Sequence, residues 1–165
     1  TAVYVVLNFA GTVRLGWINI SVASLPVIVG AMLYGPVGGL LVGLLGAFMG
    51  QLLTYGVTAT TILWILPQAA RGLLVGIYAK HCGYSFSRGQ LTAALIGTAL
   101  VVTALNTGAM YIDSVIYNYY SYAYVFGGLV VRIISGAATA VLMVFVAPPV
   151  VNLLNRSLDT VRTAQ

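Results

Sequence analysis

The sequence predicts an all-α integral membrane protein, a bundle of six transmembrane helices with N- and C-termini in the cytoplasm. The 165 residues are 61% hydrophobic and 5% charged, whereas ordinary globular domains carry roughly 25% charged residues. The mean hydropathy is +1.03, and a soluble chain of this size still exposes about a third of its unfolded-state surface. Gly, Pro and the few charges divide the chain into apolar pieces, some near the ~20 residues that span a bilayer. We expect one transmembrane domain over residues 1–165.

The first half of the chain predicts three helices. Residues 1–13 are short for a span, and no basic region precedes them as in a signal peptide, so we expect the first helix to lack its leading residues. Residues 14–21 are polar and aromatic, with an alternation that fits extended backbone. The second helix, residues 22–34, ends at Gly35-Pro36, which predicts a tight turn. The third helix follows at residues 37–55.

The second half predicts three more helices. The fourth helix, residues 60–79, precedes the most polar stretch, residues 80–90. The fifth helix, residues 91–112, leads into a tyrosine-rich connection, residues 113–122. That connection predicts either an interfacial aromatic belt or a lid over a ligand site.

The sixth helix, residues 123–154, is expected to break at Pro148-Pro149 and to leave a polar tail. Six spans place both termini on one side. That side also holds four cations, Lys80, Arg88, Arg156 and Arg162. The positive-inside rule assigns it to the cytoplasm. The net charge of +5 therefore reflects topology, and nucleic-acid binding is a poor alternative.

Two arginines, Arg71 and Arg132, lie deep inside apolar segments, where a charge costs at least ~2.5–3.5 kcal/mol. Asp113 is expected at the outer edge and Asp159 in the tail, so neither pairs with them. Arginine cannot be neutralised by deprotonation. Each must therefore find main-chain carbonyls, water or an anionic ligand, and we expect an anionic solute from outside as the partner. Arg71 has an alternative, because its side chain can snorkel to the cytoplasmic interface.

Polar and aromatic side chains converge on the predicted outer side. Trp64, Gln68 and Arg71 share one helical face at spacing i, i+4, i+7. In hydrocarbon such groups must face protein or a wet cavity. Hydrogen bonding between helices is the alternative for Gln68. The candidate ligand-binding residues are Arg132, Trp64, Gln68, Arg71, Asn106, Trp17, Asn19, Arg14, Tyr124 and Tyr111. Residues 14–21 and 113–122 are expected to close over the ligand.

Catalytic chemistry has few residues to use. The one cysteine, Cys82, adjoins the one histidine, His81, in a predicted loop, and the chain has no glutamate. We therefore expect no enzyme, cofactor or metal site. A self-contained secondary transporter of a small organic anion is the main alternative, although no carboxylate lies in a predicted span to couple to H⁺ or Na⁺. A structural scaffold is the third.

Small residues recur every four positions at Gly35, Gly39, Gly43 and Ala47. This spacing lets helices approach closely. The stripe predicts either packing within the bundle or a docking face for another membrane subunit.

The stretch Ser24–Gly50, SLPVIVGAMLYGPVGGLLVGLLGAFMG, resembles the substrate-binding subunit, or S component, of energy-coupling factor (ECF) vitamin transporters. In that family the pattern PxxxGAxLxGPxxGxxxGxxG joins the second and third helices. The matching residues here are Pro26, Gly30, Ala31, Gly35, Pro36, Gly39, Gly43 and Gly46. The family's first helix commonly docks through an Ala-xxx-Ala face, of which only Ala2 and Ala10 are candidates here.

The resemblance implies a multi-pass protein of the bacterial plasma membrane that captures a vitamin from outside. Its partners would be a transmembrane coupling subunit and two ATPase subunits, and the chain itself lacks a phosphate-binding G-x-x-x-x-G-K-[ST] loop. Arginine suits a carboxylate, and Trp and Tyr suit a flat ring. These preferences favour folate over pantothenate or biotin, and thiamine, a cation, fits poorly.

Overall fold

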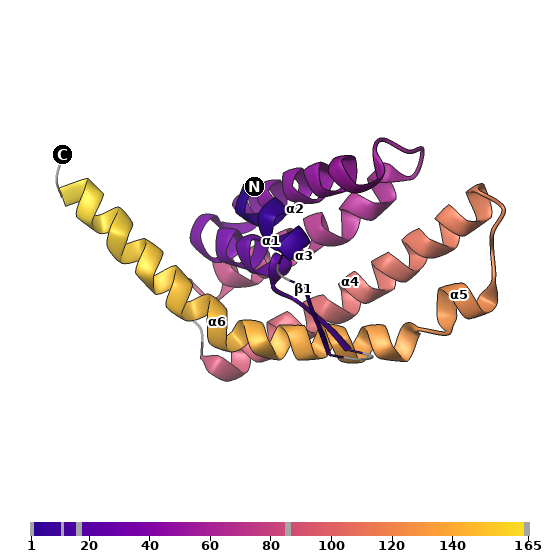
Figure 1. Cartoon of the computed structure of the whole chain (residues 1–165). Coiled ribbons are helices and arrows are strands. Elements are labelled where there is room, and N and C mark those ends of the chain that lie inside the picture. Colours follow the sequence, from indigo (N-terminus) through magenta and orange to yellow (C-terminus); the bar gives the residue numbers. More distant parts are fainter. Residues whose placement is uncertain (1, 11, 16–17, 85–86, 164–165) are drawn as a thin grey trace.

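The computed structural model describes residues 2–10, 12–15, 18–84 and 87–163, with side chains for residues 2–8, 22–84 and 87–157. The elements run in the order α1 (Ala2–Ala10), β1 (Thr12–Leu15), β2 (Ile18–Ser21), the 3-10 turn η1 (Val22–Ser24), α2 (Leu25–Tyr55), α3 (Thr61–His81), α4 (Arg88–Ile116), α5 (Tyr122–Phe126) and α6 (Leu129–Thr163) (Figure 1).

The architecture is that of a helical membrane protein. Within the described residues, four stretches are long and apolar enough to cross a bilayer: Val22–Tyr55, Thr61–His81, Arg88–Ile116 and Tyr122–Ser157. The expectation of a multi-pass helical protein is therefore confirmed. The count of six spans and the cytoplasmic termini stay predictions.

The stretch predicted as extended backbone forms a hairpin, which the all-helical expectation did not include. β1 and β2 pair antiparallel, with Arg14 opposite Asn19, and β2 packs against α6. Alternating side chains allow a strand pair to form next to the short helix α1.

Helix α2 is two arms joined at a sharp turn. Gly35 has φ +73° and ψ −161°, a conformation that glycine adopts at no steric cost. A Cβ on Gly38 would lie 3.3 Å from the carbonyl oxygen of Gly30, whereas residues eight apart in a straight helix are separated by about 12 Å. The chain therefore folds back at Gly35-Pro36, and the predicted turn is confirmed.

The small residues of α2 pack against α3 of the same chain. Cβ atoms built on Gly39 and Gly43 would run into the main chain of Gly72 and of Gln68, respectively. The four predicted docking positions on α2 are buried (Gly35, Gly39, Gly43 and Ala47). These contacts support the packing alternative, and subunit docking stays a prediction. Ala2 is exposed, and the side chain of Ala10 lies outside the described set.

The core joins the first arm of α2 to α3, α4 and α6. Its members include Ile28, Ala31, Val75, Leu95 and Met143. Many large apolar side chains face outward instead, as a helix surface in contact with lipid requires.

Two helix boundaries differ from the prediction. α6 continues through Pro148 and Pro149 to Thr163, so the expected break and the end of the helix at residue 154 are wrong. Apolar helix-forming sequence on both sides carries the helix on, and Figure 1 shows α6 changing direction towards the C-terminus. α4 extends to Ile116, which places Asp113 inside a helix instead of in the connection.

Candidate functional site

A cavity of about 350 Å³ lies where α2 and α4 end and α3 begins. Its walls come from the ends of these helices, from the connection after α4 and from α5. The lining residues are Gln51, Tyr55, Thr58, Thr60, Trp64, Asp113, Tyr117, Tyr119 and Tyr124. The cavity lies at the end of the bundle that is predicted to face outside, and this orientation stays a prediction.

Asp113 is the acidic residue of this cavity. It is 9% exposed, and its carboxylate accepts hydrogen bonds from Thr60 Oγ1, Trp64 Nε1 and Tyr119 OH. The Trp64 bond is 3.4 Å long. A carboxylate offers about four acceptor positions. Three are used by these donors, two of them on Oδ1, so Oδ2 retains one position for a ligand.

The threonine-rich turn before α3 holds one of these donors in place. The main-chain N–H of Thr58 donates to Thr61 Oγ1 at 2.8 Å, and that of Thr61 donates to the Thr58 carbonyl at 3.1 Å. The hydroxyls of Thr58 and Thr60 are 3.3 Å apart. Thr60 is 1% exposed. The turn thus orients Thr60 towards Asp113.

Tyrosines cover the other wall of the cavity. Tyr119 and Tyr124 meet edge to face with ring centroids 5.5 Å apart, and outside the lining Tyr111 meets Tyr120 in the same way at 5.5 Å. The hydrogen bond that Tyr119 donates to Asp113 raises the pKa of Tyr119. Its hydroxyl therefore stays protonated at neutral pH and keeps donating.

Of the predicted ligand residues, Trp64 and Tyr124 line this cavity. Tyr111 is exposed and meets Tyr120 edge to face, and neither is among the residues that line the cavity. Asn106 is half-buried on α4. Arg14 and Asn19 face each other across the hairpin, but their side chains, like all of Trp17, lie outside the described residues.

Arg132 has partners within the protein. Its guanidinium donates to the main-chain carbonyls of Val125 and Gly128, to Thr107 Oγ1 at 3.4 Å and to Met110 Sδ at 2.8 Å. Main-chain carbonyls, one of the kinds of partner left open for this charge, thus accept its hydrogen bonds, so the guanidinium is satisfied without an anionic solute. α5 and the turn after it bring carbonyl oxygens within reach, which the helical pattern alone did not reveal. A ligand-binding role for Arg132 stays a prediction.

Arg71 and Gln68 lie deeper than Trp64. Arg71 sits about 10 Å further along α3 and lines a small chamber of about 20 Å³ with Ser24, Thr98 and Thr139. Gln68 Oε1 is buried without a hydrogen-bond partner among the described residues. The predicted face of α3 therefore lines two separate cavities, with Trp64 at the larger one and Arg71 at the small chamber.

Sequence reasoning missed Asp113 and Thr60 as site residues. Asp113 was placed in the connection, although the residues after it, Ser114-Val115-Ile116, allow one more helical turn. Within the described residues, no group of three His, Cys, Asp or Glu side chains could hold a metal ion.

The comparisons with known proteins agree with this architecture. The model of the family described as "ECF transporter, substrate-specific component" matches residues 1–151. A UPF0397 protein of Lactobacillus gasseri is 41% identical over 51 residues, which cover 31% of this chain and 26% of that protein. The chain thus spans about a quarter of the length of this curated relative. Because the family match extends over most of the sequence, the chain belongs to the substrate-specific components of ECF transporters, a family of transporter subunits and not of enzymes.

Proposed function

We propose that the chain captures a vitamin outside the cell and that the cavity around Asp113 is its binding site. The observation that carries the proposal is a buried carboxylate with one acceptor position left, inside an aromatic cavity. Ligand sites are mostly apolar concavities with a few placed polar groups. Asp113 would accept an N–H of the ligand, and Trp64 with the tyrosines would contact its ring.

The size of the cavity limits what it holds. About 350 Å³ is near the lower end of the ~300–1,000 Å³ typical of ligand sites. It suits a flat ring system, with the remainder of a larger ligand reaching towards the surface. Closure by residues 14–21 and 113–122 would then exclude water.

We propose folate as the vitamin. Its pterin ring is flat and carries N–H donors for Asp113, and its carboxylates would suit the guanidinium of Arg132. Delivery would follow docking on a transmembrane coupling subunit with two ATPase subunits. Thiamine is the second candidate, because a cationic ring also suits the Asp113 carboxylate.

Calorimetric titration of the purified subunit against folate, thiamine, biotin and pantothenate tests the ligand. A folate Kd weaker than ~1 μM, about −8.2 kcal/mol, would remove folate. Tyr34→Phe, an exposed tyrosine beside the turn in α2, is the control for Tyr119→Phe. Only Tyr119→Phe, whose side chain lines the cavity, should change the affinity for the vitamin.

Uptake into vesicles tests the energy source. We expect uptake to need ATP and the coupling subunits. Uptake driven by an ion gradient with this subunit alone would favour the secondary-transporter alternative.

A further inference from the structure

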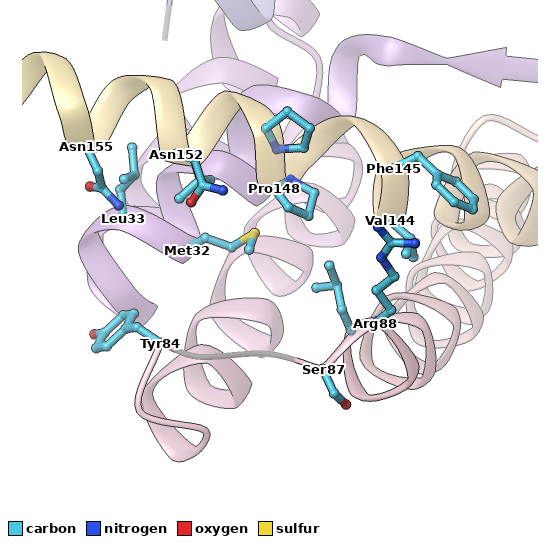
Figure 2. Close-up of a pocket in the computed structure, with 13 residues that line it drawn as sticks. Met32, Leu33, Tyr84, Ser87, Arg88, Val144, Phe145, Pro148, Asn152 and Asn155 are labelled. Carbon is cyan, nitrogen blue, oxygen red and sulfur yellow. The ribbon is translucent and has the colours of Figure 1, made fainter.

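A second and larger groove lies at the other end of α4. Its volume is about 840 Å³, and its walls come from the first arm of α2, the start of α4 and the proline region of α6 (Figure 2). Arg88 and Asp113 are 25 residues apart in one helix, about 37 Å. The groove is therefore separate from the Asp113 cavity.

The polar groups of this groove are suited to an anion. In Figure 2 the Arg88 side chain reaches towards α6 near Val144, and Asn152 and Asn155 point from α6 towards Met32 and Leu33. A guanidinium donates only, and an asparagine amide supplies two donors. No carboxylate is among the described residues that line the groove.

The rest of the lining is apolar and firmly packed. Met32, Leu91, Val144 and Val151 are each between 2% and 8% exposed, so these walls belong to the core and do not collapse into the groove. Two further lining residues, Tyr84 and Phe145, are 50% and 64% exposed. An occupant needs an apolar part to cover them. A free phosphate ion would leave them exposed.

The basic residues at this end of the bundle favour an anionic amphiphile as the occupant of the groove. Lys80 and Arg156, like Arg88, belong to the predicted cytoplasmic end. Basic pockets between transmembrane helices bind the headgroups of anionic lipids.

We propose that the groove between α2, α4 and α6 is a binding site for an anionic phospholipid of the surrounding leaflet. The phosphate accepts hydrogen bonds from Arg88 and from the amides of Asn152 and Asn155. The first methylenes of the acyl chains pack on the more accessible apolar lining residues, Leu33 and Phe145. This site does not depend on the identity of the vitamin.

Native mass spectrometry of the protein released from nanodiscs tests the site, with phosphatidylglycerol and phosphatidylcholine as equimolar lipids. We expect wild type to retain phosphatidylglycerol preferentially. One Lys or Arg at an anionic surface contributes about 1 kcal/mol, so Arg88→Gln should lower this preference about five-fold. Arg88 is exposed, and the Ser87 cap of α4 does not use its side chain, so the variant should fold.

Lys80→Gln is the matched control, because Lys80 carries the same charge but lines a different pocket with Pro36, Ile77 and His81. It should retain the wild-type preference. Asn152→Leu removes a donor without changing charge and should weaken retention. Excess inorganic phosphate should not displace the lipid.

Three results would overturn the proposal: equal retention of the two lipids by wild type, an equal loss in Arg88→Gln and Lys80→Gln, or displacement by phosphate alone. The second would show attraction by the charge of this end in general. The third would show a site for the free ion.

Discussion

The contact of α3 with the turn in α2 is the most direct test of the architecture. A Cβ added at Gly76 would lie 2.5 Å from Pro36 Cα, 2.6 Å from Pro36 N and 2.7 Å from the carbonyl carbon of Gly35. Carbon atoms in contact need about 3.5–4.0 Å. Gly76→Ala must therefore separate α3 from the turn by about 1.0–1.5 Å, since main-chain atoms cannot rotate away.

Overpacking of this kind costs typically 1–3 kcal/mol. The control is Gly97→Ala, also within a helix, where an added Cβ meets nothing within 4 Å. Alanine is favoured over glycine in a helix by up to about 1 kcal/mol, and both variants share this gain. We therefore expect Gly76→Ala to unfold about 1–3 kcal/mol more easily than Gly97→Ala.

Unfolding in mixed micelles with increasing SDS, followed by circular dichroism, measures this difference. Vitamin affinity measured on the folded fraction separates loss of fold from loss of the site. If Gly76→Ala is as stable as Gly97→Ala, α3 does not approach the turn as closely as described here.

Three further predictions concern the end of the bundle that carries the Asp113 cavity. Asp113→Asn should weaken vitamin binding by about 2 kcal/mol or more, because a buried charged acceptor is lost; calorimetry with unchanged affinity would move the site elsewhere. Arg132→Ala should lower the melting temperature, because the carbonyls of Val125 and Gly128 lose their donor. An unchanged melting temperature with affinity weakened by about 2–5 kcal/mol would instead make Arg132 a ligand group. Tyr119→Phe should destabilise the protein most below pH ~10, near the ordinary pKa of tyrosine in the unfolded chain. The raised pKa of Tyr119 in the folded state adds stability that is lost as pH rises above ~10 towards the folded-state pKa. Unfolding measured from pH 7 to pH 11 should show the deficit shrinking at the alkaline end, and a constant deficit would contradict the bond to Asp113.

Much of the fold followed from local pattern. The Gly35-Pro36 turn needed only the conformational freedom of glycine and the missing N–H of proline. The four-residue spacing of Gly39 and Gly43 predicted close helix approach, which the contacts with α3 now describe. The break predicted at the two prolines of the last helix was wrong, because α6 continues through Pro148 and Pro149.

The site was harder to predict than the helices. Trp64 and Tyr124 were recognised as polar or aromatic residues near helix ends, and both line the cavity. Asp113 was missed because its role depends on Thr60, which is 53 positions away in the sequence. Periodicity shows which face a residue occupies, but not which distant residue meets it.

By itself the sequence determined that this chain is an integral membrane protein, because so much apolar surface is not stable in water. It also determined the turn at Gly35-Pro36, since glycine and proline act locally. Only the tertiary structure decided how Arg132 and Asp113 are satisfied. Arg132 donates to carbonyls brought close by α5, and Asp113 accepts from Thr60 before α3, from Trp64 of α3 and from the tyrosine connection. Hydrogen bonds form between atoms that are close in space, and separation along the chain does not specify that closeness.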